Sequence, residues 1–425
     1  MAFRDFSFPP STPLYPHANI VQQYLEDYAD AHNLRQHIRL STSVKCVLPE
    51  RSNGKHVWKV VSSRLPTEEE TTEYFDTLII ANGRNGYPVL PSNIPRLSEW
   101  IAQGKASHSK SYREPSTYHD MNIVVVGNGP SALDIAPELV GVAKHVYRSV
   151  RNARETNSDA HDRPANDLSN MQAARDVQLC SAIRSLGSPE DGSVGLVDGT
   201  TLTGVDHILF ATGYETCFPF LDVPVLNGTP ERETAIPDES QWTLNSGQHL
   251  FPLSLHMLPT SSDLPLGSLF FLGLPRPVVP FPLVEGQCQV IEAILSGTLS
   301  LNLHEQDRSA RTAMEALLKR VGGSEALAAR EWHKLPDALQ FDYRVELARL
   351  ARRDSQLMVP DWQRCIYEKK RELRAAWKEL ERTGKDKDIV QDVGTKGEQE
   401  WVELMNRILE GSQTSVQGIL EDEKI

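Results

Sequence analysis

One segment, NIVVVGNGPSALD, which begins at Asn122, restricts the fold of this chain more than any other. Its apolar run Ile123–Val126 predicts a buried parallel strand. Small residues then follow at the three positions of a dinucleotide-binding turn, where they allow a tight turn, close approach of a pyrophosphate, and close packing of helix on strand. These residues are Gly127, Gly129 and Ala132.

The residues after this turn predict a helix, Ser131–Leu139, and a second strand, His145–Val150. A helix in this position directs its N-terminal N–H groups and the positive end of its dipole at the phosphates. The order strand, turn, helix, strand is the order that a nucleotide-binding unit requires. We therefore expect contacts to the cofactor's pyrophosphate from Gly127, Asn128, Gly129, Pro130 and Ser131.

The end of the second strand indicates which dinucleotide binds. An NAD-selective site has an acidic residue there, which bonds the ribose 2′-hydroxyl. This chain instead has Arg148, Ser149 and Arg151, and its next acidic residue is Glu155. Arginine suits a doubly charged 2′-phosphate, so the sequence favours NADP(H). The alternatives are an NAD site and arginines that are merely solvated at a strand end.

Two other apolar runs, Ile79–Ala81 and His207–Ala211, also stop at small-residue turns. Ligands of parallel-sheet proteins bind at such carboxyl ends. Thr212 and Gly213 follow the second run directly, so both are candidate cofactor-binding residues. Their alternative role is structural, in shaping the turn.

Composition excludes several functions. The 425 residues have a formal charge of −13, which argues against nucleic-acid binding. The five cysteines are scattered without CxxC or metal-ligand spacing, so we expect a reducing compartment, the cytoplasm, and no metal. No apolar run of about 18 residues is present, and the first residues lack a signal-peptide core, so no transmembrane span is expected.

Several motifs together resemble the flavin-containing monooxygenases. The turn GNGPSALD is similar to the family's NADP-binding signature GxGxSxxD, and Gly104, His108 and Tyr112 match three positions of the fingerprint FxGxxxHxxx(Y/F). The leading aromatic of that fingerprint is Ala102 here. FATGY, which ends at Tyr214, and PLVEGQ match two further family elements, and QFDYRVELA resembles the fungal-type branch.

The resemblance implies an α/β fold with two Rossmann-like dinucleotide-binding domains, three-layered, and a helical C-terminal extension. It implies the cofactors FAD and NADP(H), and places Glu285 and Gln287 near the flavin. The implied boundaries are a first part of the FAD domain at 1–118, an NADP domain at 119–215, a second FAD part at 216–304, the extension at 305–382, and a linker, short helix and acidic tail at 383–425. The helical extension is expected to pack on the main body, with partner binding as the alternative.

The implied reaction is oxygenation of soft nucleophilic nitrogen or sulfur atoms of small molecules by O₂ through a C4a-hydroperoxyflavin. Baeyer–Villiger relatives have Trp followed by Pro or Asp where this chain has Tyr112-Arg113, which favours heteroatoms over ketones. The cofactors perform this chemistry, so no catalytic residue is assigned. Homo-oligomerisation is a further expectation that the sequence does not test.

The family's first GxGxxG unit, which binds the FAD pyrophosphate, has no counterpart before the segment at Asn122. MAFRDFSFP is similar to a segment from inside the flavin domain, so Met1 is expected to be an internal methionine of a longer protein. Three alternatives follow: an NADP(H)-binding relative without flavin, a Baeyer–Villiger or N-hydroxylating monooxygenase, and a flavoprotein reductase or oxidase. The last would need a redox cysteine pair or another electron outlet, and none is visible.

Overall fold

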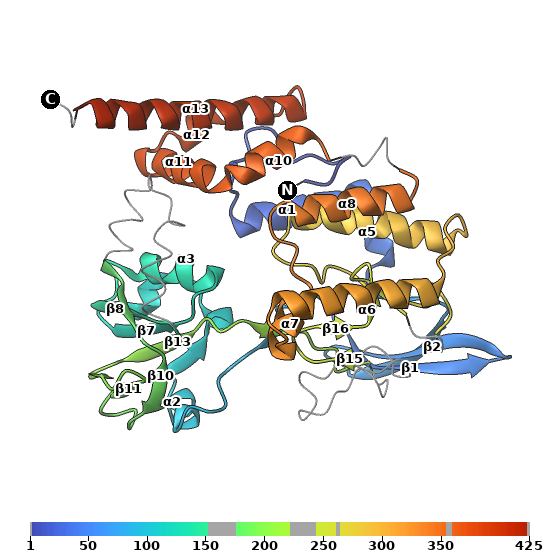
Figure 1. Cartoon of the computed structure of the whole chain (residues 1–425), viewed down its shortest axis with the longest axis horizontal. Helices are drawn as coiled ribbons and strands as arrows, with labels where there is room; N and C mark the ends of the chain where they lie inside the picture. The colour runs from blue at the N-terminus through green and yellow to red at the C-terminus, as the bar shows by residue number, and fades with distance from the viewer. Residues whose placement is uncertain (1, 152–175, 222–243, 261–263, 354–358, 423–425) are drawn as a thin grey trace. The chain divides into compact units, whose positions relative to one another are not determined.

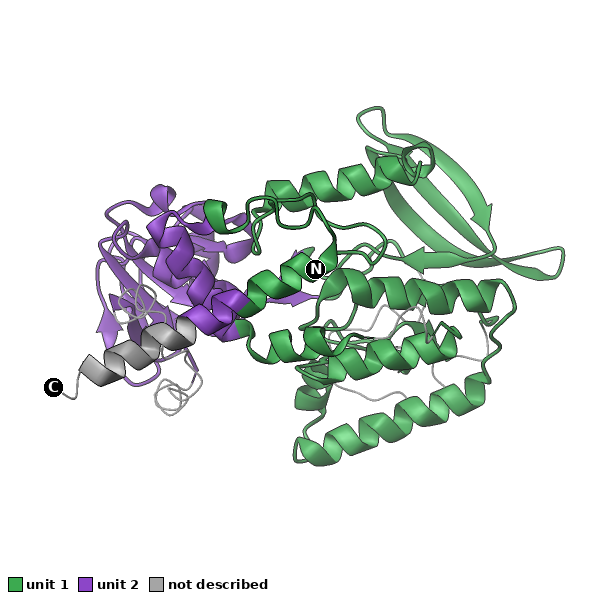
Figure 2. Cartoon of the chain, turned by 90° about the horizontal axis from the view of Figure 1, so that it is seen from above, with its two compact units in different colours: residues 1–86, 216–370, 387–406 green, residues 87–215, 371–386, 407–425 purple. Residues whose placement is uncertain are grey.

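The computed structural model describes residues 2–151, 176–221, 244–260, 264–353 and 359–422, with side chains to residue 411 in the last helix. The chain is an α/β protein, as predicted (Figure 1). It divides into two compact units (Figure 2). Unit 1 comprises Met1–Gly86, Thr216–Lys370 and Lys387–Asn406, and unit 2 comprises Tyr87–Glu215, Arg371–Asp386 and Arg407–Ile425. The domain boundaries given above stay predictions.

Unit 2 is built on a five-stranded parallel sheet in the order β6-β13-β7-β8-β9. The chain runs from β7 to β8 and β9 on one side, and later returns to place β13 on the other side of β7. The strand order therefore reverses between β7 and β13, which is where doubly wound sheets bind their ligands. The strands are β6 (Ala106–His108), β7 (Asn122–Val126), β8 (His145–Ser149), β9 (Gln178–Cys180) and β13 (His207–Phe210).

Both faces of this sheet are covered, which explains why β7 and β13 are apolar at every central position. Helix α3 (Pro130–Leu139) buries Ala132 and Ala136 against Ile123 and Val125 of β7. On the other face, Val124 packs with residues of α2 (Leu97–Ala102) and of a three-stranded antiparallel sheet. The elements of that sheet are β10 (Ile183–Leu186), β11 (Val194–Leu196) and β12 (Thr201–Leu202).

Unit 1 contains an antiparallel sheet of β1 (Thr42–Ser52), β2 (Lys55–Arg64) and β3 (Glu69–Phe75). The turn Asn53-Gly54 joins the first two with φ of 51° and 78°, which is the geometry of a two-residue hairpin turn. Strand β3 ends at Phe75, and the next strand, β4 (Leu78–Ile80), belongs to a different sheet.

Strand β4 pairs in parallel with β19 (Leu269–Phe271). The indole Nε1 of Trp58, on β2, donates to the Ser268 carbonyl at 2.7 Å and so joins this pair to the antiparallel sheet. Short strands pair elsewhere in the two units. They are β5 (Tyr87–Pro88) with β14 (Tyr214–Glu215), β15 (Leu244–Asn245) with β16 (Leu250–Phe251), and β17 (Leu253–Ser254) with β18 (Leu258–Pro259).

Helices complete both units. Helix α5 (Pro280–Leu295) begins with prolines, which are tolerated in the first turn of a helix. Helix α13 continues to Asp422, through residues expected to form a tail. No helix among the described residues is long and apolar enough to cross a membrane. The other helices are α1 (Ala18–Ala31), α6 (Leu303–Arg320), α7 (Glu325–Glu331), α8 (Leu339–Leu350), α10 (Asp361–Glu368), α11 (Lys370–Thr383) and α12 (Asp386–Ile389).

Candidate dinucleotide-binding site

The turn between β7 and α3 has the geometry that its glycines predict. Gly127 has φ of 138°, and its N–H donates to the Ser149 carbonyl of β8 at 3.0 Å. A Cβ on Gly127 would lie 2.5 Å from the Ala211 carbonyl oxygen, at the end of β13. Gly127 therefore lets the carboxyl ends of strands β7 and β13 lie close together where the strand order reverses.

Gly129 has a different environment. It is the N-cap of α3, and no atom lies within 4 Å of a Cβ built on it. Pro130 takes the first helical position, where its missing N–H costs nothing. Asn128, Pro130 and Ser131 are all exposed. The start of α3 is thus open, and the unobstructed backbone at Gly129 fits a dinucleotide pyrophosphate.

The residues predicted to select NADP(H) lie at the end of β8. Arg148 is 8% exposed and Ser149 is 2% exposed. The Ser149 hydroxyl donates to the Ser181 carbonyl at 2.9 Å, so its proton is already used inside the fold. Arg151 is exposed, just beyond the strand. Of the three, Arg151 is the side chain most accessible to a 2′-phosphate.

Thr212 and Gly213 follow β13, and both are engaged within unit 2. The Thr212 hydroxyl donates to the Val89 carbonyl, and the Gly213 carbonyl lies 3.0 Å from Nε2 of His108. Because Nδ1 of His108 accepts from the Lys110 N–H at 3.0 Å, Nε2 bears the proton and donates to Gly213. Burial lowers the pKa of His108. This histidine therefore has a structural role at the turn.

The remaining fingerprint residues are structural as well. Gly104 lies just beyond the C-cap of α2 and has φ of 70°. Tyr112 stacks on Tyr118 at 5.9 Å between ring centroids and donates to Oε2 of Glu138 at 3.0 Å. Burial and the neighbouring Glu138 carboxylate raise the pKa of Tyr112, so the phenol stays protonated.

Glu285 and Gln287 both lie in α5 of unit 1, with different surroundings. Oε2 of Glu285 accepts from the Arg4 N–H at 3.4 Å, and burial raises the pKa of Glu285. Gln287 is fully buried, and its amide bonds only protein groups: Gly273 N–H at 3.1 Å and Tyr343 hydroxyl at 2.9 Å. Any contribution of Gln287 to a flavin site therefore goes through its backbone or through the groups that it holds.

Arg84 is a residue that the sequence analysis missed. It follows β4, and its Nη1 donates to three carbonyls that follow β19, those of Gly273, Leu274 and Pro275. Burial lowers the pKa of this guanidinium. A lone arginine after a strand gives no signal in a sequence, because its partners lie 189 to 191 residues away.

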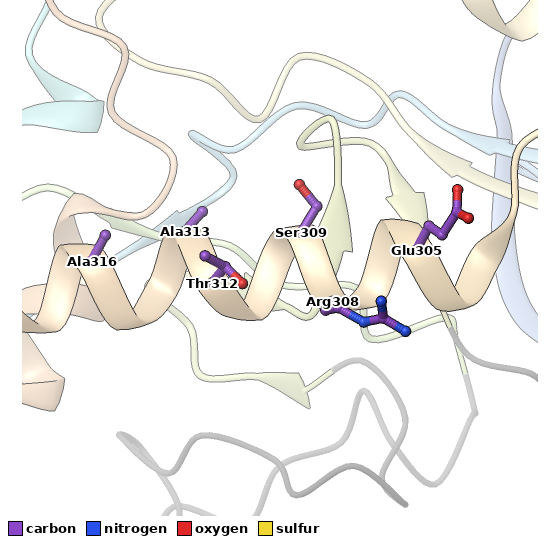
Figure 3. A pocket seen from close by; sticks show the side chains of 6 residues that line it. All are labelled: Glu305, Arg308, Ser309, Thr312, Ala313 and Ala316. Carbon is purple, nitrogen blue, oxygen red and sulfur yellow. The ribbon is translucent and has the colours of Figure 1, made fainter.

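The surface hollow on α6 is not part of either site (Figure 3). All the residues that line it are exposed and come from this one helix: Glu305, Arg308, Ser309, Thr312, Ala313 and Ala316. In the part of the chain that the structure describes, no group of three or more His, Cys, Asp or Glu side chains could hold a metal ion.

The switch-point turn, the open start of α3 and the doubly covered sheet define unit 2 as a dinucleotide-binding unit of the doubly wound class. Unit 1 fits a nucleotide cofactor less completely, because no glycine-rich strand–turn–helix is found among its described residues. The elements of unit 1 that could contact a cofactor are helix α5 and the loops that follow the parallel strands β4 and β19.

Comparisons with known proteins identify the family. Residues 1–163 match the model of flavin-binding monooxygenase-like proteins. Thiol-specific monooxygenase of Saccharomyces cerevisiae is 31% identical over 305 residues, 71% of this chain and 63% of the yeast protein. Flavin-containing monooxygenase FMO GS-OX-like 4 of Arabidopsis thaliana is 30% identical over 357 residues, 82% of this chain and 70% of the plant protein.

A solved structure agrees with these matches. S-allyl-L-cysteine S-oxygenase from Allium sativum superposes with a TM-score of 0.67 at 25% identity, covering 97% of this chain and 82% of that one. This chain belongs to the flavin-containing monooxygenase family, whose members bind FAD and NADPH. It spans 60–63% of the length of several curated relatives, the yeast protein among them.

Proposed function

We propose that this chain provides an NADPH- and FAD-dependent monooxygenase that transfers oxygen from O₂ to soft nucleophilic nitrogen or sulfur atoms of small molecules. The observation that supports this most directly is the open turn at Gly129, placed where the strand order of the sheet reverses. Family membership supplies the reaction class, and the turn supplies a place for NADPH.

In this proposal Gly127, Asn128, Gly129, Pro130 and Ser131 bind the NADPH pyrophosphate. The backbone at Gly129 leaves room for it, and the N–H groups of α3 stabilise its charge. Arg151 binds the 2′-phosphate through charge-assisted hydrogen bonds. Buried Arg148 contributes positive charge, and Ser149 together with Thr212 and Gly213 shapes the turns rather than touching the cofactor.

The flavin is proposed to lie against the loop before α5, with Glu285 and Gln287 fixing the helix that follows. When bound, FAD and NADPH supply the electrons and activate O₂, and the protein's task is to orient them and to exclude water. The buried amide of Gln287 serves orientation, since it ties α5 to the end of β19. The finer mechanism stays an expectation of the family.

The substrate class is proposed from the relatives. Names of two relatives specify sulfur, one a thiol-specific monooxygenase and the other an S-allyl-L-cysteine S-oxygenase. We therefore favour a sulfur atom over a nitrogen atom in this chain's substrate. Product analysis with a thioether, a tertiary amine and a cyclic ketone tests this choice, because ketone oxygenation would indicate Baeyer–Villiger chemistry instead.

The first test is an absorbance spectrum of the purified chain with added FAD, followed by NADPH under air. A flavin band that NADPH bleaches supports the monooxygenase proposal. If no flavin binds while NADPH does, the monooxygenase proposal is wrong for this chain alone. That result would favour the second candidate, an NADP(H)-binding protein without flavin.

The observation behind the second candidate is the contrast between the two units. The parallel sheet of unit 2 has five strands, whereas among the described strands of unit 1 only β4 and β19 pair in parallel. A cytoplasmic location and homo-oligomerisation are further proposals. None of the five cysteines forms a disulfide, which agrees with a reducing compartment.

A further inference from the structure

The loop between β19 and α5, residues Gly273–Val279, is held in place mainly by groups outside it. The loop contains two prolines and a glycine, and its buried residues are Leu274 and Pro275. Arg84 fixes its first carbonyls from one side, as described above. The other side is fixed by the C-terminal helical extension.

Helix α8 of that extension provides two buried polar side chains. Gln340 is 1% exposed, and its Oε1 accepts from the Val279 N–H at 2.8 Å. Val279 is the residue directly before α5, so this bond fixes the point at which the helix starts. A buried side-chain amide on α8 thus determines the start of another helix.

Tyr343 lies one helical turn further along α8 and is 6% exposed. Its hydroxyl accepts from Nε2 of Gln287 and donates to the Leu255 carbonyl at 2.5 Å. Because the Tyr343 hydroxyl orients the amide of Gln287, Oε1 of Gln287 points at the Gly273 N–H. The two side chains of α8 therefore control the amides at both ends of the loop.

Two backbone contacts add to this attachment. The Arg276 N–H donates to the His333 carbonyl, and the Arg276 carbonyl accepts from the Leu335 N–H, each at 2.8 Å. His333 and Leu335 lie between α7 and α8. Helix α8 also packs closely on α5, since a Cβ on Gly286 would lie 3.2 Å from Cδ1 of Leu347.

We infer that Gln340 and Tyr343 are positioning residues, which hold the loop Gly273–Val279 in the conformation that a bound flavin requires. The C-terminal extension then helps to form the cofactor site, in addition to packing on the rest of unit 1. The inference rests on the proposed function only for the identity of the cofactor, because the hydrogen bonds exist without it.

The test measures amide hydrogen exchange at Val279 and Gly273 in the cofactor-free protein, together with the dissociation constant for FAD. Gln340→Met removes the acceptor of the Val279 N–H at similar volume. Loss of one such hydrogen bond should speed exchange there about 3- to 10-fold and weaken FAD binding by a similar factor. Tyr343→Phe should do the same at Gly273 and is the second variant if the first folds poorly.

Two controls separate positioning from general destabilisation. Arg349→Gln changes an exposed residue of α8 and should leave both readouts unchanged. Leu317→Ala opens a cavity in a different cluster of unit 1 and should lower the melting temperature without selective exchange at Val279.

Unchanged exchange in both α8 variants would overturn the inference, as would faster exchange with unaltered FAD affinity. If the unmodified protein binds no FAD, the proposed function fails. Exchange at the two amides then decides by itself whether α8 holds the loop.

Discussion

The Ala211 carbonyl oxygen lies where a side chain on Gly127 would have to go, 2.5 Å from an ideal Cβ. The two residues directly follow adjacent strands of the parallel sheet, β13 and β7, at the point where the strand order reverses. The backbone of Gly127 also has φ of 138°, a conformation that L side chains rarely adopt. Gly127 is thus required by the fold itself, whether or not a nucleotide binds.

Gly127→Ala and Gly129→Ala should therefore behave differently. The first adds strain and a clash with Ala211, and should cost about 2–4 kcal/mol of unfolding free energy. The second meets no atom within 4 Å and should leave stability nearly unchanged while reducing NADPH affinity. Thermal unfolding and an NADPH fluorescence titration on both variants measure the two effects. Full NADPH affinity in Gly129→Ala would contradict the assignment of the turn.

This pair also shows what the sequence can and cannot predict. The strand, turn and helix around Gly127 depend on local pattern. Together with the other family motifs, they predicted the α/β fold and the family correctly. The sequence also identified both glycines, with a tight turn at Gly127 and room for a pyrophosphate at Gly129. The contact between Gly127 and Ala211 joins residues distant in the chain, and no local pattern reveals it.

The site in unit 1 was harder to predict for the same reason. Glu285 and Gln287 were found from a motif, but the partners that fix Gln287 are Gly273 and Tyr343, which lie 14 and 56 residues away. Their roles at a cofactor stay predictions. Arg84 was missed, because nothing near it in the sequence distinguishes a half-buried arginine from a solvated one.

Arg151→Ala tests the preference for NADPH. If Arg151 binds the 2′-phosphate, its loss should weaken the binding free energy of NADPH by about 1.5–3 kcal/mol, which is measured as a higher KM or Kd. The binding of NADH should be nearly unaffected. Arg184→Ala is the matched control, since Arg184 is an exposed arginine on β10 of the same unit. An equal effect of Arg151→Ala on both cofactors would show that the residue does not select NADPH.

A pair of histidines, His333 buried and His256 half-buried, should make unit 1 sensitive to acid. The Leu250 N–H donates to Nε2 of His333 at 3.1 Å, so the His333 proton is on Nδ1 and is donated to Nδ1 of His256, also at 3.1 Å. Neither ring can gain a proton without losing one of these bonds. Burial lowers the pKa of His256 to about 4. Burial also lowers the pKa of His333 well below its usual value, as do His256, His249, Arg276 and Arg84.

The sign of the pH effect follows from these pKa values. Below the pKa of about 6.5 that histidine has in the unfolded chain, the unfolded chain binds protons that the folded pair does not bind. The free energy of unfolding is therefore highest above pH 6.5 and falls as the pH is lowered toward 4. The loss should reach about 3 kcal/mol for His256 alone. Urea unfolding at several pH values measures the slope.

His256→Asn should flatten that slope. Asparagine tolerates the φ of 51° found at this position, and its side-chain oxygen can still accept from His333. His304→Asn, at an exposed histidine on α6, is the control and should keep the full slope. A pH dependence that His256→Asn leaves intact would assign the acid sensitivity to other groups.

The packing of α5 on α8 gives the last prediction. A methyl group on Gly286 would lie 3.2 Å from Cδ1 of Leu347, a side chain that is fully buried. Gly286→Ala should therefore destabilise by about 1–3 kcal/mol through overpacking, and Leu347→Ala by about 2–5 kcal/mol through a cavity. In the double variant the added methyl group occupies part of that cavity, so the loss should be smaller than the sum of the two. Additive losses in a double-mutant cycle would show that the two residues do not limit each other's packing.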